Sequence, residues 1–261
     1  MKYKVLDIID FMNNWAKLEY QESWDNSGVQ INLNGETNSV TIALDLTDKV
    51  IDMAIKNDSK LIITHHPMFF SGLKSIDENT YIGKIIIKAI KNNISIYSAH
   101  TSLDIAENGV NDVLCEVIGL NEIEGLSMAD SGYMIGKVGY LEKEKLLKDI
   151  YLELSEKLNY SNIRIYGDIK NNIKKIAVCG GSGSSMIDDA IKKDVDLYIT
   201  GDIKHHDAQY AYENNITLMD ISHFNGEKLV LNKVASELSK NFEIVTNIID
   251  TNDFEVKVEN M

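Results

Sequence analysis

The sequence predicts an α/β fold made of two similar α/β domains, with mostly parallel sheets flanked by helices. Two observations predict it. Strand and helix patterns alternate along the chain, which is typical of βαβ units and parallel sheets. Residues 54–64 also resemble residues 190–200 at a constant offset of 136 positions, which indicates an internal duplication. We therefore expect a first domain at residues 1–125, onto which residues 228–261 pack back, and a second domain at 126–227.

The first half begins with apolar side chains at helical spacing over residues 3–20. Residues 24–30 then form a turn that leads into a short strand. The elements expected after this turn are a strand at 40–44, a helix at 47–57, a strand at 60–64, a helix at 80–91 and a strand at 94–98. This alternation is what places the first half in the α/β class.

The second half starts after a change of pattern around residues 120–135, where glycines mark a connection. The glycines are Gly119, Gly125, Gly132 and Gly136. Beyond them we expect strands at 137–141, 161–166, 176–179, 197–200 and 242–248, and helices at 142–158, 184–193 and 225–239. Residues 176–200 repeat the pattern of the first half. No linker or low-complexity segment separates the halves, so we expect them to pack firmly together.

Composition restricts the class of partner. The formal net charge is −14, and Arg164 is the only arginine. Such a chain lacks the basic surface that holds phosphate backbones or anionic lipid, so we expect no binding to nucleic acid or to membranes. The absence of a signal peptide and of an apolar run of about 18 residues favours a cytoplasmic protein. Cys115 and Cys179 lack CxxC spacing and indicate neither a disulfide framework nor a cysteine-ligated zinc.

Histidines and carboxylates gather directly after the expected strands. Because the carboxyl ends of parallel strands meet at one edge of a sheet, the fold would bring these side chains together. The residues concerned are His65, His66, His100, Asp104, Asp202, His223 and Glu227. Both halves contribute to the set, so we expect a metal site in the cleft between the two domains.

The adjacent pair His65-His66 suits two metal ions better than one. On an extended segment, adjacent side chains point to opposite sides, so each histidine would reach a different ion. Pro67 biases His66 away from the helical region and helps to fix this extended geometry. The alternative is a pair of surface or core histidines without a ligand.

Asp104 and Glu227 are the candidate bridging carboxylates. Two divalent ions about 3.5–4 Å apart need shared anionic ligands to offset their mutual repulsion. His223 and Glu227 would share one face of a helix, although Glu227 alone could merely complement the helix dipole. His100 is either a further ligand or a group that orients Asp104 through its ring N–H, and we favour the second role.

Two further segments carry candidate functions. Gly181, Ser182 and Gly183 follow an expected strand and resemble a loop of exposed amides that binds an anion, although a tight strand-to-helix turn explains them equally simply. His205-His206-Asp207 could supply an acid–base pair beside the metals, or could be exposed loop residues. We take His206 and His100 as the candidate catalytic residues.

These residues belong to six motifs that resemble one family over essentially the whole chain. The motifs are Trp24-Asp25-Asn26-Ser27-Gly28-Val29-Gln30, Thr64-His65-His66-Pro67, His100-Thr101-Ser102-Leu103-Asp104, Gly180-Gly181-Ser182-Gly183, Thr200-Gly201-Asp202-Ile203-Lys204-His205-His206-Asp207-Ala208 and His223-Phe224-Asn225-Gly226-Glu227. In this order they resemble the Nif-three-like proteins, also labelled dinuclear metal-centre proteins or GTP cyclohydrolase 1 type 2 homologues.

The resemblance implies two similar α/β domains, a dinuclear site between them and assembly into a homohexameric ring. It implies the metal ligands His65, His66, Asp104, His223 and Glu227, the same set that the spacing suggests. Longer members carry an inserted domain for which this chain is too short. Members more usually have Gly before the last His and Thr or Ser before the final Glu, where this chain has Ser222 and Gly226.

Two classes of function compete at this point. The first is a metal-dependent hydrolase with two divalent ions per chain, acting on a small nucleotide-like or heterocyclic substrate, as the cyclohydrolase label implies. The second is a metal-binding or regulatory ring protein without chemistry of its own. An acid–base group beside the metals would favour the first. Mixed nitrogen and oxygen ligands suit Fe, Mn, Zn or Ni, so the sequence does not select the metal.

Overall fold

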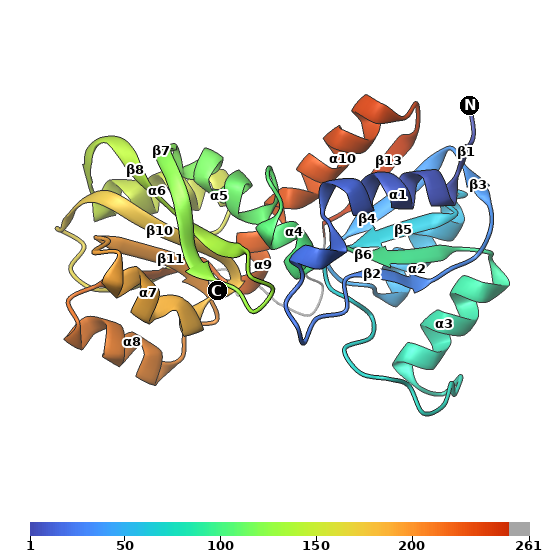
Figure 1. Cartoon of the computed structure of the whole chain (residues 1–261), viewed down its shortest axis with the longest axis horizontal. Coiled ribbons are helices and arrows are strands. Elements are labelled where there is room, and N and C mark those ends of the chain that lie inside the picture. The colour runs from blue at the N-terminus through green and yellow to red at the C-terminus, as the bar shows by residue number, and fades with distance from the viewer. Residues whose placement is uncertain (251–261) are drawn as a thin grey trace, which may run out of the picture.

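Residues 1–250, which the computed structural model describes, form two lobes that lie side by side, each built on its own β-sheet (Figure 1). We call the elements around the five-stranded sheet the first lobe and those around the six-stranded sheet the second lobe. Two short helices, α4 (Thr101–Ile105) and α9 (His223–Glu227), lie where the lobes meet (Figure 1). The α/β class predicted from the sequence is confirmed.

The first lobe has a mostly parallel sheet. Its elements are β1 (Tyr3–Lys4), α1 (Val5–Trp15), η1 (Leu18–Tyr20), β2 (Gly28–Ile31), β3 (Glu36–Thr37), β4 (Ser39–Ala43), α2 (Asp48–Lys56), β5 (Leu61–Thr64), α3 (Tyr81–Lys91), β6 (Ser95–Ser98), α10 (Leu229–Asn241) and β13 (Val245–Ile249). The strand order is β13-β4-β5-β6-β2. Only β2, at one edge, runs antiparallel to its neighbour. The carboxyl ends of β4, β5 and β6 therefore lie at the same edge of the sheet.

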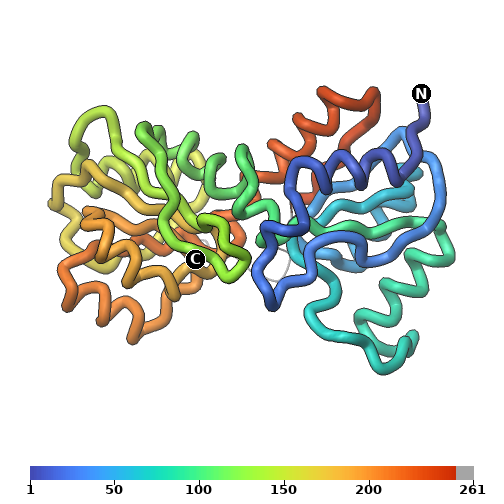
Figure 2. Tube along the Cα trace, in the orientation of Figure 1, coloured from blue at the N-terminus to red at the C-terminus, as the bar shows by residue number. Residues whose placement is uncertain are grey.

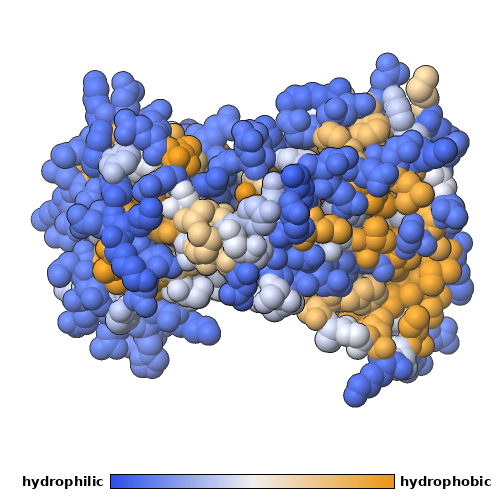
Figure 3. Space-filling model, in the orientation of Figure 1, coloured by the Kyte–Doolittle hydropathy of each residue, from blue (hydrophilic) through white to orange (hydrophobic). Residues whose placement is uncertain are grey.

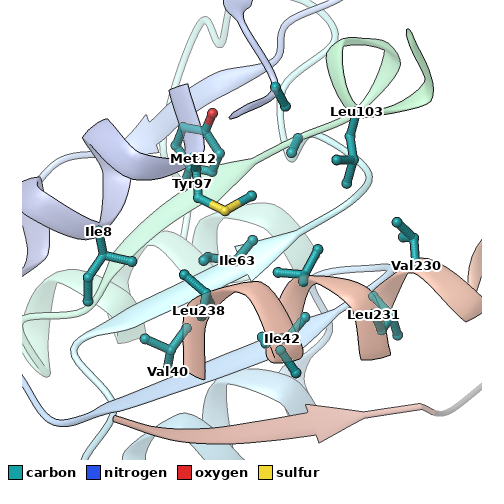
Figure 4. Close-up of a cluster of buried hydrophobic side chains, with 14 of the residues drawn as sticks. Ile8, Met12, Val40, Ile42, Ile63, Tyr97, Leu103, Val230, Leu231 and Leu238 are labelled. Carbon is teal, nitrogen blue, oxygen red and sulfur yellow. The ribbon is translucent and has the colours of Figure 1, made fainter. Parts of the chain in front are cut away.

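Helices cover both faces of this sheet. On one face α1 and α10 bury Ile8, Met12 and Leu238 against the sheet residues Ile42 and Ile63 (Figure 4). On the other face α2 and α3 pack against the sheet in a second apolar cluster. Each fully buried aliphatic side chain contributes about 1.5–3 kcal/mol, so the two layers hold the sheet firmly. The sheet edge that carries His65 and His66 is therefore a rigid platform.

The second lobe has a mixed sheet of order β7-β8-β10-β11-β12-β9. Its elements are α5 (Val110–Ile118), β7 (Leu120–Met128), β8 (Met134–Leu146), α6 (Leu147–Leu158), β9 (Arg164–Tyr166), β10 (Asn172–Ser182), η2 (Ser184–Met186), α7 (Ile187–Lys192), β11 (Leu197–Gly201), α8 (His205–Glu213) and β12 (Thr217–Asp220). One face packs against α5 and α6, and the other against α7 and α8.

The prediction of a mostly parallel sheet is wrong for the second lobe. Only β10, β11 and β12 run parallel, while β7, β8 and β9 pair antiparallel with their neighbours. The short turn between β7 and β8 can join only antiparallel strands, which accounts for this pair. The three parallel strands still bring their carboxyl ends to one edge, and this edge carries the second half of the candidate site.

Some element boundaries also differ from those expected. Residues 120–128 form a strand rather than a connection, and residues 142–146 continue β8 rather than starting a helix. The charged run Glu142–Lys145 suits an exposed helix by composition, but it pairs with β10 as a strand. Both segments lie toward the edge of their sheet, where exposed polar side chains hide the strand signal.

The chain passes to the second lobe and then returns to the first (Figure 2). Strand β13 pairs with β4, and α10 packs in the core of the first lobe. Helix α5 contributes Val110 to the first lobe's core and Leu114 to the second lobe's core. The division into domains at residues 125 and 227, and the internal duplication, stay predictions. No helix within residues 1–250 is long and apolar enough to cross a membrane.

Candidate metal centre

Three strand ends bring the candidate ligands together. His65 and His66 directly follow β5, and His100 precedes α4, which carries Asp104. From the second lobe, α9 begins at His223 and ends at Glu227, shortly after β12. The Nε2 atoms of His66 and His223 lie 3.1 Å apart, so the two lobes meet at these side chains.

Four histidines are fixed through their Nδ1 atoms. His65 Nδ1 lies 2.7 Å from the carbonyl oxygen of Ala99, which can only accept a hydrogen bond. The Nδ1 atoms of the other three each lie within 2.8 Å of a carboxylate oxygen. These pairs are His66 with Asp45, His100 with Asp25, and His223 with Asp202. With the proton held at Nδ1, each neutral ring keeps its Nε2 lone pair for a ligand.

The free atoms converge on a small buried region. Glu227 Oε2 lies 3.0 Å from His66 Nε2 and 3.2 Å from His223 Nε2. His65 Nε2 lies 3.5 Å from Glu227 Oε1 and 3.6 Å from Asp104 Oδ1. When the rings are neutral and carry their proton at Nδ1, His65 Nε2, Asp104 Oδ1 and Glu227 Oε2 have no hydrogen-bond partner in spite of these short separations.

Buried polar atoms without a partner are costly, because each loses its hydration and gains nothing in return. Here three such atoms face each other from two histidine-rich sheet edges. Imidazole nitrogen and carboxylate oxygen are donors that suit divalent transition metals. The arrangement therefore fits a metal centre, and the carboxylates of Asp104 and Glu227 lie beside the histidines as candidate ligands.

The electrostatics of the cluster show how strongly it attracts positive charge. Burial would lower the pKa of His66, but contacts with Asp45 and Glu227 raise it to about 10. Burial opposes protonation of His223 as well, yet Glu227 and Asp202 raise its pKa to about 9. Without a metal, protons on these histidines balance the buried carboxylates. A metal ion that binds here must displace those protons.

The two carboxylates differ in their own protonation. Burial raises the pKa of Asp104 to about 6, and His65 offsets only part of this effect. Burial would also raise the pKa of Glu227, but His65 and His223 hold this pKa well below its usual range. Glu227 is thus an anion near neutral pH, and it sits where both lobes meet.

His100 belongs to the same cluster. Three ring nitrogens lie within 4.8 Å of one another, one each from His65, His66 and His100. Asp25 holds His100 by its Nδ1 atom at 2.7 Å and is itself fixed by Ser27 at 2.8 Å and Thr101 at 2.5 Å. Burial alone would raise the pKa of Asp25, but these bonds outweigh that effect and lower the pKa. The geometry suits His100 either as a ligand or as a positioned acid–base group; its role stays a prediction.

The glycine segment has a clear packing role. A Cβ on Gly181 would lie 2.3 Å from Glu227 Oε1, and its φ of +67° disfavours other residues. The amide nitrogens of Gly180 and Gly183 bond to side-chain oxygens of Asn111 and Thr200, at 3.0 and 2.9 Å. The segment from Gly180 to Ser182 belongs to β10. The glycines make room for Glu227, while anion binding by Gly181, Ser182 and Gly183 stays a prediction.

His206 is not brought to the cluster. It lies exposed in the first turn of α8, with its ring 5.3 Å from that of His205. No hydrogen bond, ion pair or ring contact within residues 1–250 joins it to the other four histidines. Its catalytic role stays a prediction, and the geometry favours His100 instead.

Ser222, which directly precedes the candidate ligand His223, has a strained backbone. Its φ of +66° and ψ of 156° lie in a region that is essentially restricted to glycine. This explains why the resembled family more usually has Gly at this place. The Ser222 hydroxyl oxygen partly compensates by accepting a hydrogen bond from the amide of Asn225. At Gly226 a Cβ would meet its neighbours at ordinary contact distances, the nearest at 3.4 Å, so no glycine is required there.

Sequence reasoning missed Asp45, and it named Asp25 and Asp202 without predicting that each would orient a histidine. Asp25, Asp45 and Asp202 orient His100, His66 and His223. Asp45 follows the end of β4 and Asp202 follows the end of β11. Their place after strands was the available signal, since it is the same signal that identified the histidines.

Comparison with known proteins relates nearly the whole chain to one family. A family model described as Duf34/NIF3 (NGG1p interacting factor 3) matches residues 3–253. A protein of Clostridium perfringens (strain 13 / Type A) named GTP cyclohydrolase 1 type 2 homolog is 38% identical, over 92% of this chain and 93% of its own. A Staphylococcus epidermidis (strain ATCC 35984) protein of the same name is 27% identical over 366 aligned positions, covering 97% of this chain and all of its own.

Solved structures show the same fold. A Bacillus cereus protein related to NIF3 superposes with a TM-score of 0.89 at 25% identity, over 98% of this chain and 99% of its own. Reduced HcgD from Methanocaldococcus jannaschii superposes with a TM-score of 0.84 at 30% identity, over 96% and 99%.

Proposed function

The chain belongs to the Duf34/NIF3 family, and from that premise we propose that it is a metal-dependent hydrolase of a small nucleotide-like or heterocyclic substrate. The observation that carries the proposal is the convergence of three buried, unpartnered ligand atoms, His65 Nε2, Asp104 Oδ1 and Glu227 Oε2. A cluster of this kind beside an oriented histidine favours catalysis, because the cluster can hold a metal ion and the histidine can exchange a proton.

Five side chains would hold two divalent ions, of Fe, Mn, Zn or Ni. They are His65, His66, Asp104, His223 and Glu227. When bound, such ions supply a Lewis acid that polarises the bond to be broken and makes water acidic near neutral pH. Five protein ligands shared by two ions leave positions for water and substrate, since each ion takes about four to six donors.

The chain's own acid–base group would be His100. Asp25 holds the proton of His100 at Nδ1, so Nε2 is the atom that accepts a proton from water or returns it to a leaving group. Ser27 and Thr101 keep Asp25 in place, which fixes the direction of the His100 ring. Asp25 is thus a positioning residue rather than one that touches the substrate.

Turnover by metal-loaded protein tests the proposal. The protein is purified anaerobically, loaded with each candidate metal and assayed against nucleotides and pterin precursors. GTP belongs in the screen because relatives carry the cyclohydrolase name. We expect metal-dependent turnover that falls about 100-fold or more in His100→Ala, the low end for loss of a general acid–base group. His205→Ala, which removes an exposed histidine of α8, is the matched control, and His206→Ala tests the other candidate catalytic residue. Metal loading without turnover of any compound would contradict the proposal.

A metal-binding or regulatory ring protein is the second candidate. The observation that favours it is the burial of the cluster: the side chains of His65 and Glu227 are 1% and 4% exposed. Structural and storage sites are closed by protein ligands, whereas catalytic sites keep an open position. Spectroscopy of a bound cobalt probe decides between them, because added azide changes the spectrum only where a coordination position is open.

A further inference from the structure

Two exposed aromatic rings stand beside His100. Trp24 is 57% exposed and Phe70 is 58% exposed. Each ring centroid lies 5.7 Å from that of His100, at interplanar angles of 76° and 77°. The Trp24 and Phe70 rings lie 6.5 Å apart and are inclined by only 26°. Two near-parallel rings thus stand roughly perpendicular to the imidazole of the candidate acid–base group.

The aromatic pair is held by hydrogen bonds rather than by a hydrophobic core. Asn26 Nδ2 donates to the carbonyl oxygen of Phe69 at 2.7 Å, and the amide of Phe69 donates to Gln30 Oε1 at 3.2 Å. Asp25, next to Trp24, is bonded to His100. These contacts tie the segments of Trp24 and Phe70 to each other and to the metal centre. The rings are therefore preorganised, yet their faces are open to solvent.

A cavity adjoins Phe70 and the two residues that follow Trp24. It has a volume of about 470 Å³ and is lined by Asp25, Asn26, Phe69, Phe70, Ser71, Gly72 and Leu73. This is within the range of small-molecule sites, about 300–1,000 Å³. The lining combines the aromatic residues Phe69 and Phe70 with the amide of Asn26 and the hydroxyl of Ser71, while the Asp25 side chain is fully buried. Such a lining suits a planar ring that carries polar groups at its edge.

We propose that Trp24 and Phe70 bind the planar, nitrogen-containing ring of the substrate by stacking, with its edge toward His100. The proposal rests on the proposed function and adds the ring-binding part of that site. The ring centroids lie 6.5 Å apart, within the range of about 4.5–7 Å for aromatic pairs in contact, so a planar ligand can stack on the exposed surface of the pair without entering between the rings. Stacking tolerates any heteroaromatic base, because every base has a π face.

Charge also favours a neutral flat ring at this position. The residues that line the cavity include no lysine or arginine, the Asp25 side chain beneath it is fully buried, and the chain has a net charge of −14. An anionic group of a ligand would be repelled from the cavity and would be drawn instead toward cations at the metal centre. The heteroaromatic ring is thus the part of a nucleotide-like ligand that this cavity fits.

Equilibrium dialysis with guanosine, cytidine and pterin as probes tests the assignment directly. We expect saturable binding by metal-loaded protein and a weakening of about tenfold or more in Trp24→Leu and in Phe70→Leu. Tyr212→Leu on α8 removes an aromatic ring that is 66% exposed and is the matched control. Ribose serves as the non-planar control ligand and should not bind. Circular dichroism establishes that each variant keeps its fold.

The outcomes separate this proposal from the proposed function. Ring binding that depends on Trp24 and Phe70 without any turnover would support the stacking site and count against the hydrolase. Turnover with a KM that is unchanged in Phe70→Leu would overturn the stacking site and leave the hydrolase standing. Failure of all three planar probes to saturate the protein would also overturn it. In a Trp15→Phe variant, Trp24 is the remaining tryptophan, and fluorescence that acrylamide cannot quench would also overturn the proposal, because a second copy would then cover the rings.

Discussion

At the scale of single residues, the site depends on how each imidazole is oriented. Oxygen acceptors hold the Nδ1 atoms of His65, His66, His100 and His223 within 2.8 Å, so every Nε2 atom is left for the cluster. Three of the four acceptors are carboxylates, which also raise the basicity of the ring. The site therefore depends on the residues that orient the histidines as well as on the atoms that would contact a metal.

Replacement of Asp45 by Asn is expected to lower metal affinity by about 10–100-fold without unfolding the protein. The carboxylate lies 2.8 Å from His66 Nδ1, and its loss removes both the orienting contact and part of the negative charge. Titration of metal-free protein with a competing chelator measures the affinity. Asp58→Asn, which changes the same charge at an exposed position, is the control. Equal affinities in both variants would contradict the orienting role.

The raised pKa values of His66 and His223 predict that the stability of the metal-free protein falls as the pH rises, whereas the affinity for metal increases. Their folded values, about 10 and about 9, lie above the unfolded value near 6.5. Their contribution to the stability of the metal-free protein is therefore complete below about pH 6.5 and is lost as the pH rises through 9 and 10. Metal binding needs the neutral rings, so affinity should rise over the same interval.

Thermal unfolding with and without chelator, at several pH values between 6 and 10, tests both trends. We expect the Tm of the metal-free protein to fall toward pH 10 while the stabilisation by metal grows. Calorimetry in two buffers of different ionisation enthalpy should also detect protons released on metal binding at pH 7.5. Binding without proton release would show that these histidines are already neutral.

At the scale of elements, the strands and site residues that could be predicted are the buried apolar strands and the polar residues that directly follow them. The run Leu61–Thr64 and the histidines after it identified β5 and the first ligands, because a buried strand is continuously apolar. Strand β7 gave no such signal, since its residues from Asn121 to Glu124 are exposed. The aromatic pair of Trp24 and Phe70 could not be predicted, because the two residues are far apart in sequence and join only through loops.

Ser222 offers a test of strain at an element boundary. Ser222→Gly should stabilise the chelated protein by about 1 kcal/mol or more over Ser222→Ala, because glycine alone is unstrained at this φ and ψ. Both variants lose the hydroxyl that caps α9, so the cap cancels in the comparison. Urea unfolding gives the two free energies. Equal stability of the two variants would show that the backbone here is not strained.

At the scale of the whole molecule, both lobes are needed for the site. The first lobe supplies His65, His66 and Asp104, and the second supplies Asp202 at the end of β11. Helix α9, which carries His223 and Glu227, directly follows β12 and directly precedes α10, which returns to the first lobe. A change that shifts one lobe against the other would thus separate His66 from His223 and lower metal affinity.

We predict a closed homo-oligomer, and a hexamer by resemblance to the family. Figure 3 shows hydrophobic residues gathered on one side of the first lobe, whereas hydrophilic residues cover most of the second lobe on the same face. Helices α2 and α3 of the first lobe expose Ile55 and Ile90 at 37% and 52%. Exposed apolar surface of this kind favours association between copies, which usually closes with symmetry.

Light scattering at micromolar concentration measures the assembly. Six copies of the 29.4 kDa chain are expected in one particle. Ile90→Asp should shift the distribution toward smaller species if this surface forms a contact. A monomer near the mass of one chain would refute the oligomer.

The most direct test of the account is a crystal structure of metal-loaded protein with anomalous scattering recorded at the metal edge. We predict two anomalous peaks per chain, about 3.5–4 Å apart, with Asp104 and Glu227 between them. His65 and His66 should bind different ions, and His223 should bind the ion next to His66. A single peak, or two peaks more than about 5 Å from these side chains, would contradict a dinuclear centre shared by the two lobes.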